Sequence, residues 1–80
     1  MYQILGQTTV TVNTEEAYVV TPADGTAYTW SVTKGYIVSG QGTANITVHW
    51  TDTGQGEVGV TISGGGSGGG SIVIVIDIDG

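Results

Sequence analysis

An all-β chain folded as an antiparallel β-sandwich of about seven strands is the fold class that this sequence predicts. Apolar and polar residues alternate with a period of two in run after run, and no convincing stretch shows the i, i+3, i+4 apolar spacing of a helix. The runs are rich in threonine, valine, isoleucine, tyrosine and tryptophan, which suit a half-buried strand. Turn residues separate them at intervals of about 8–12 residues, which is typical of a sandwich.

The first strands are expected near the N-terminus. Val10 and Val12 share a face with Thr8, and Ile4 and Leu5 are expected to pack just before a bend at Gly6. The next run covers residues 17–21. It ends in the turn "PADG" at residues 22–25, where proline presets φ and glycine accepts a positive φ.

Four further runs follow, at residues 27–33, around residue 37, at residues 45–51 and at residues 57–63. In the runs at residues 27–33, 45–51 and 57–63 the large apolar side chains fall on one face, which predicts a strand with one buried side. The run around residue 37 is predicted to be a short strand between glycine turns. The inward positions predicted for the core are Tyr28, Trp30, Val32, Ile37, Ile46, Val48, Trp50, Val58, Val60 and Ile62.

The C-terminal segment "GGGSGGGSIVIVIDIDG" joins a featureless glycine/serine block, residues 64–71, to a strand-prone run. We expect residues 72–79 to pair antiparallel with residues 57–63 and to complete the core. Asp77 and Asp79 fall on the other face, where they are expected to protect the strand end from open-edge association. The inward face of this run carries Ile72, Ile74, Ile76 and Ile78.

The chain is therefore interpreted as one domain with a body at residues 1–63, a linker at residues 64–71 and a last strand at residues 72–80. A block this regular favours an engineered linker over a natural low-complexity one. Its reach of roughly 16 Å spans a neighbouring strand or the facing sheet. The last strand could be the domain's own, a transplanted or designed one, or one that pairs with another molecule.

Composition narrows the function classes. Seven acidic residues against one lysine give a net charge of −6, which disfavours nucleic acid and anionic membranes as partners. No apolar run approaches the ~20 residues that span a bilayer, so membrane insertion is not expected. The first residues lack the basic start and apolar stretch of a secretory signal. Without cysteine, stability must come from packing and backbone pairing.

No catalytic, cofactor or metal site is predicted. Asp77, Asp79 and Gly80 resemble the start of a calcium loop but lack its further ligands. Adjacent Glu15 and Glu16 are interpreted as a solvated turn. His49 is interpreted as an exposed surface histidine, because no motif supplies it with a nucleophile or a carboxylate.

Three other patterns also favour a structural interpretation. Tyr28, Trp30 and Trp50 could form an aromatic platform for a sugar, but their alternation favours the core. The glycines of "SGQGT" could suggest a phosphate cradle, but no lysine or helix N-terminus follows, so they are interpreted as turn residues. "NIT" at residues 45–47 fits an N-glycosylation pattern that is frequent by chance.

Three motifs follow the run that holds Tyr28 and Trp30: "SGQGT" at residues 39–43, "ITVHW" at residues 46–50 and "GEVGV" at residues 56–60. With these motifs, residues 27–63 resemble the PKD-like, immunoglobulin-fold repeats of secreted and surface bacterial proteins. Such repeats carry a tyrosine and tryptophan on one strand, then "G-x-I-x-S-G-Q-G-T", "I-T-V-x-W" and "G-x-V-x-V". Residues 4–22 are similar to the first two strands of these repeats, with less specificity. The motif resemblance ends near Ser63, where family members often carry a cysteine, a natural loop and a threonine-rich last strand. The matching residues are Tyr28, Trp30, Gly35, Ile37, Ser39, Gly40, Gln41, Gly42, Thr43, Ile46, Thr47, Val48, Trp50, Gly56, Val58 and Val60.

The resemblance implies a non-catalytic structural or adhesion module with an immunoglobulin-like sandwich, located outside the cell or on its surface in the parent protein. Neighbouring copies of the same chain, joined by edge-strand pairing, are the partner that the strand-rich sequence favours. Two alternatives remain open at this point. One is a strand-exchanging subunit of an extracellular filament, and the other is a carbohydrate-binding module.

Overall fold

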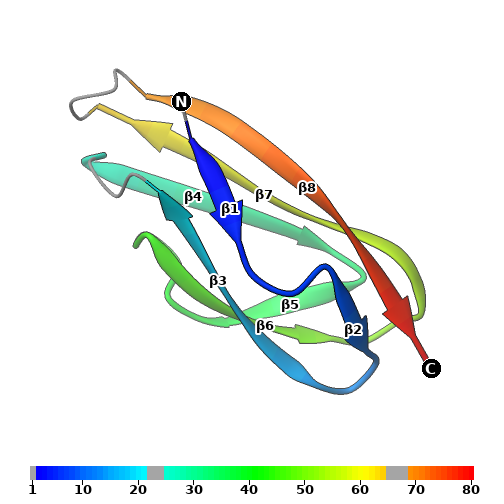
Figure 1. The fold of residues 1–80 in the computed structure, drawn as a ribbon. Coiled ribbons are helices and arrows are strands. Elements are labelled where there is room, and N and C mark those ends of the chain that lie inside the picture. The colour runs from blue at the N-terminus through cyan, green and yellow to red at the C-terminus, as the bar shows by residue number, and fades with distance from the viewer. Residues whose placement is uncertain (1, 22–24, 65–68) are drawn as a thin grey trace.

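Two four-stranded sheets pack face to face in the computed structural model of the chain, which describes residues 2–21, 25–64 and 69–80 (Figure 1). The first sheet has the order β1-β3-β6-β5 and the second the order β2-β8-β7-β4. The first sheet contains β1 (Gln3–Leu5), β3 (Glu15–Thr21), β6 (Asn45–Trp50) and β5 (Gly35–Ser39). The second contains β2 (Thr9–Thr11), β8 (Gly70–Asp79), β7 (Gly54–Ser63) and β4 (Ala27–Thr33). This is an all-β sandwich with the sheet arrangement of an immunoglobulin-like fold.

The N-terminal segment forms two strands that join different sheets, so the described residues form eight strands where about seven were predicted. β1 pairs antiparallel with β3, and β2 pairs in parallel with β8. The chain changes sheets after Gly6, where a Cβ would collide with the ring of Tyr18. Glycine therefore allows the crossing segment to pass close to β3.

β8 lies inside the second sheet, between β2 and β7. It pairs antiparallel with β7 from Ile62↔Gly70 to Gly54↔Ile78. Its other edge meets β2 only over Thr9↔Asp77 to Thr11↔Asp79. The expectation that Asp77 and Asp79 protect an open edge is therefore wrong, because β2 covers that end of β8.

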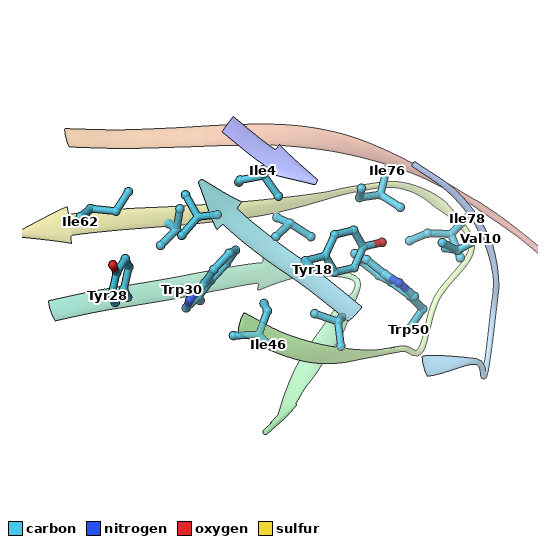
Figure 2. Packing of buried hydrophobic residues seen from close by; sticks show 14 residues of the cluster. Ile4, Val10, Tyr18, Tyr28, Trp30, Ile46, Trp50, Ile62, Ile76 and Ile78 are labelled. Carbon is cyan, nitrogen blue, oxygen red and sulfur yellow. The ribbon is translucent and has the colours of Figure 1, made fainter. Parts of the chain in front are cut away.

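The core lies between the two sheets, and Figure 2 shows its side chains converging there from both. Of the inward positions predicted from the alternation, Val32, Ile37, Ile72 and Ile74 are only half-buried. Val32 and Ile37 lie on edge strands, and Ile72 and Ile74 lie in the part of β8 that β2 does not flank. The remaining predicted positions are buried: Tyr28, Trp30, Ile46, Val48, Trp50, Val58, Val60, Ile62, Ile76 and Ile78.

The N-terminal strands contribute the rest of the core. Ile4, Val10, Tyr18 and Val20 are buried. Leu5, which was expected to pack with Ile4, is 45% exposed. Successive residues of a strand point to opposite faces, so burial of Ile4 in β1 turns Leu5 outward.

Tyr18 and Trp50 form an edge-to-face pair at the end of the core where β2 lies (Figure 2). Their ring centroids are 6.2 Å apart and their planes meet at 87°. The Tyr18 hydroxyl donates a hydrogen bond to the carbonyl of Gln7 at 2.6 Å, which ties the sheet-crossing segment to β3. Burial raises the pKa of Tyr18 to about 12, and the nearby Trp50 indole opposes this only in part.

Candidate functional site

The loop between β5 and β6 contacts the outer edge of β4 through the side chain of Gln41. Its Oε1 accepts a hydrogen bond from the backbone N–H of Trp30 at 2.7 Å. Its Nε2 donates to the backbone carbonyl of Trp30 at 3.0 Å. The side-chain amide thus makes the same pair of bonds that a residue of an adjacent strand would make.

Two glycines and a threonine hold Gln41 in this position. Gly40 and Gly42 have φ values of +93° and +91°, a region that favours glycine. A Cβ on Gly40 would also collide with the carbonyl oxygen of Asn45. The carbonyl of Thr43 accepts a bond from the Trp30 indole Nε1 at 2.6 Å, and its hydroxyl donates to the Gly40 carbonyl at 2.6 Å.

β4 is an edge strand, with β7 as its one neighbour in the second sheet. Because the backbone groups of Trp30 point away from β7, those of Tyr28 and Val32 point the same way by the alternation of an antiparallel strand. An edge of this kind is a template for another strand. Gln41 occupies the middle of it. The "SGQGT" residues were predicted to be turn residues, and the role of Gln41 as a side-chain partner of β4 was missed.

A second polar cluster crosses the outer face of the first sheet, where Glu15, His49 and Tyr36 lie on three adjacent strands. His49 Nδ1 is 3.6 Å from Glu15 Oε2, and the Tyr36 ring stacks on the imidazole with centroids 5.3 Å apart. His49 is half-buried, so its prediction as an exposed histidine is wrong. Glu15 and Glu16 begin β3 and are not turn residues. The register Glu15↔His49↔Tyr36 brings the three side chains together.

The aromatic residues considered for sugar binding are not available at the surface. Tyr28, Trp30 and Trp50 are 9%, 3% and 0% exposed. Their side chains point between the sheets (Figure 2). These three residues therefore form no platform on which a sugar ring could stack.

The acidic C-terminal end shows little that suggests a metal centre. Asp77 Oδ1 accepts a hydrogen bond from Gln55 Nε2 at 3.3 Å across the β7–β8 pair. Among the described residues, no three histidine, cysteine or acidic side chains are close enough to share a metal ion. Over the same residues, no helix has the length and apolar character needed to cross a membrane.

A shallow depression lies on the outer face of the second sheet, above Gly59 of β7. Ser31 of β4 and Val73 of β8 flank it, together with Thr61 and Ser71. None of the residues that line this depression is charged. The exposed side chains of Val73 and Val75 continue from it along β8.

Comparison with known proteins gives one family. A model of the PKD-like domain family matches residues 1–75. The match extends past Ser63, where the motif resemblance ended, through the glycine/serine block and into β8. No curated protein and no solved structure matches the chain. Residues 70–75, the first part of β8, therefore lie within the span that the family model covers.

Proposed function

The chain belongs to the PKD-like domain family, and we propose that it is a non-catalytic spacer that bears tension between its two ends in an extracellular or surface protein. Family membership supports a structural module in general. The more specific role rests on one observation, which is the parallel pairing of β2 with β8 near the C-terminal end.

The two ends of the sandwich are far apart. Tyr2 lies beside the first residue of β8, since a Cβ on Gly70 would be 3.6 Å from its Cδ2. β8 then runs ten residues to Asp79, about 30 Å at ~3.3 Å per residue. The molecule measures 40 × 20 × 15 Å, and its termini lie toward opposite ends of the long axis (Figure 1). Consecutive modules joined through such termini would extend in line.

Tension between the ends acts on the β2–β8 pair in shear. β2 is pulled through its N-terminal side and β8 through its C-terminal side, so the two parallel strands are drawn past each other. The hydrogen bonds between them then bear the load together. The bonds from Asp77 N–H to the Thr8 carbonyl and from Val12 N–H to the Asp79 carbonyl, both 2.7 Å, flank this pair.

Single-molecule pulling tests the proposal with two geometries on one fold. Handles at the chain ends load β2 and β8 in shear. The second geometry uses a handle at the C-terminus and a handle on a cysteine that replaces Thr53, which lies next to Gly80. Pulling between these two points separates β7 from β8 one hydrogen bond at a time. We expect a clearly higher rupture force between the chain ends than in the peeling geometry. Equal forces would contradict a tension-bearing role.

We further propose that β8 completes its own sandwich through the glycine/serine tether. The nine-residue register with β7 and the burial of Ile76 and Ile78 support this. Truncation after Ser63 should yield an unfolded or aggregating chain, and a peptide of residues 72–80 should restore structure. A truncated chain that remains monomeric and cooperatively folded would contradict it.

Strand exchange is the second candidate, supported by the part of β8 before Asp77, which no strand among the described residues flanks on its outer side. A tethered strand can also be donated to a neighbouring copy, as in strand-complemented assemblies. In that case the intact chain forms concentration-dependent oligomers or fibres, measured by size exclusion with light scattering. A monomer over the same range of concentration supports completion within one chain.

A further inference from the structure

We propose that Gln41 closes the β4 edge against strand pairing, and that a second copy of this chain pairs with that edge when the Gln41 contact is lost. The proposal is independent of the tension-bearing role. It rests on the two hydrogen bonds between the Gln41 amide and the Trp30 backbone, at 2.7 and 3.0 Å.

The position of Gln41 is the first step. Trp30 is the central residue of β4, with three strand residues on each side. A strand approaching this edge must bond to the N–H and carbonyl of Trp30, and both are already bonded to Gln41. The Thr43 carbonyl, bonded to the Trp30 indole, keeps the loop beside the strand. Because Gln41 already occupies the N–H and carbonyl of Trp30 in the middle of β4, an incoming strand cannot pair along the β4 edge.

The composition of β4 identifies the occupant as a second copy. An antiparallel pair of β4 strands centred on Trp30 would place Tyr28 opposite Val32 and Trp30 opposite Trp30, so every outward-facing backbone group finds a partner. Ala27–Thr33 contains no charged residue, so two copies meet without like charges along the shared edge. The edge strand of a sheet usually carries charges, a bulge or a proline that prevents this pairing. β4 pairs with β7 in an unbroken register and has none of these.

The outer face of β4 agrees with this pairing. Thr29 and Ser31 are exposed β-sheet residues with small side chains, and they would lie opposite each other across the two copies. Because Trp30↔Trp30 would be a hydrogen-bonded pair, Thr29↔Ser31 would be a non-hydrogen-bonded pair, with Cα atoms about 4.5 Å apart. That separation is within the range of a disulfide.

The test is Gln41→Ala, with Gln55→Ala as the matched control. Gln55 is an exposed glutamine of β7 whose amide bonds Asp77 away from the β4 edge. At a concentration low enough to keep the chain monomeric, we expect Gln41→Ala to speed hydrogen exchange of the Trp30 amide by about tenfold or more, since the bond from this N–H to Gln41 is lost. We also expect it to form a concentration-dependent dimer in sedimentation, while Gln55→Ala and the unaltered chain remain monomeric.

Cysteine crosslinking then locates the contact. The chain has no cysteine of its own, so a mixture of Thr29→Cys and Ser31→Cys chains, each also carrying Gln41→Ala, reports on this pair alone. The mixture should form disulfide dimers faster than either chain by itself. Unchanged exchange at Trp30 in the monomeric variant would overturn the role of Gln41. Faster exchange in a chain that stays monomeric, or a dimer without preferential 29–31 crosslinks, would overturn the pairing of β4 with a second copy.

Discussion

Replacing Ile76 by alanine tests whether β8 belongs to the core of its own sandwich in solution. Ile76 is 0% exposed and lies opposite Gly56 of β7. Its side chain points between the sheets (Figure 2). Ile76→Ala removes buried carbon atoms and leaves a cavity in the core. The two effects together should lower the free energy of unfolding by about 2–5 kcal/mol.

That loss is large for this protein. A domain of 80 residues has an unfolding free energy of roughly 4–12 kcal/mol at typical values per residue. For a domain of this size, each 1 kcal/mol lowers Tm by about 4–8 °C. Ile76→Ala should therefore lower Tm by at least about 8 °C. Ile72→Ala should cost less, because Ile72 is only half-buried.

Urea unfolding followed by tryptophan fluorescence measures the effect, since Trp30 and Trp50 are both buried. Val75→Thr is the matched control. Val75 immediately precedes Ile76 in β8 and is 52% exposed. Threonine keeps its β-branched shape, so the cost of Val75→Thr should stay within about 0.5 kcal/mol. If Ile76→Ala and Val75→Thr cost the same, with unchanged m-values, then β8 does not pack its isoleucine face against the core.

Three further outcomes are expected. Trp30→Ala should lose about 3–5 kcal/mol in thermal or urea unfolding, and a slightly weakened mutant would mean that Trp30 is not central to the core. The pKa of Tyr18 is about 12 in the folded chain and 10.0 in the unfolded chain, so the unfolded chain loses the hydroxyl proton first. The free energy of unfolding should therefore fall as pH rises from 10 to 12, and Tyr18→Phe should lessen that fall. An identical dependence of stability on alkaline pH in both proteins would refute this prediction. Glu15→Gln should cost less than about 1 kcal/mol and even less at high salt, because the Glu15 side chain that contacts His49 is 54% exposed; a larger, salt-independent loss would refute a surface ion pair.

The alternation of side chains determined much of this fold before any tertiary contact was known. In β4, β6 and β7 each large apolar residue at every second position faces inward, because neighbouring side chains of a strand point to opposite faces. The same rule indicated the inward face of β8, and the turn residues between runs indicated where strands end. Those features depend on residues that are adjacent in the chain, so a local pattern is enough to reveal them.

Tertiary structure decided which strands meet and which side chains act across them. The local pattern of "ILGQTTVTV" does not indicate that β1 and β2 join opposite sheets. It also does not indicate that β2 runs parallel to a strand almost seventy residues later in the chain. The partnership of Gln41 with Trp30 and that of His49 with Glu15 also join positions far apart in the chain. Ile72 and Ile76 share one alternation yet differ in burial. Ile76 lies next to the residues of β8 that pair with β2, whereas Ile72 lies farther from them. Hydrogen bonding and burial depend on which groups fold into proximity, and that is set by the packing of the whole sandwich rather than by the order of residues within a strand.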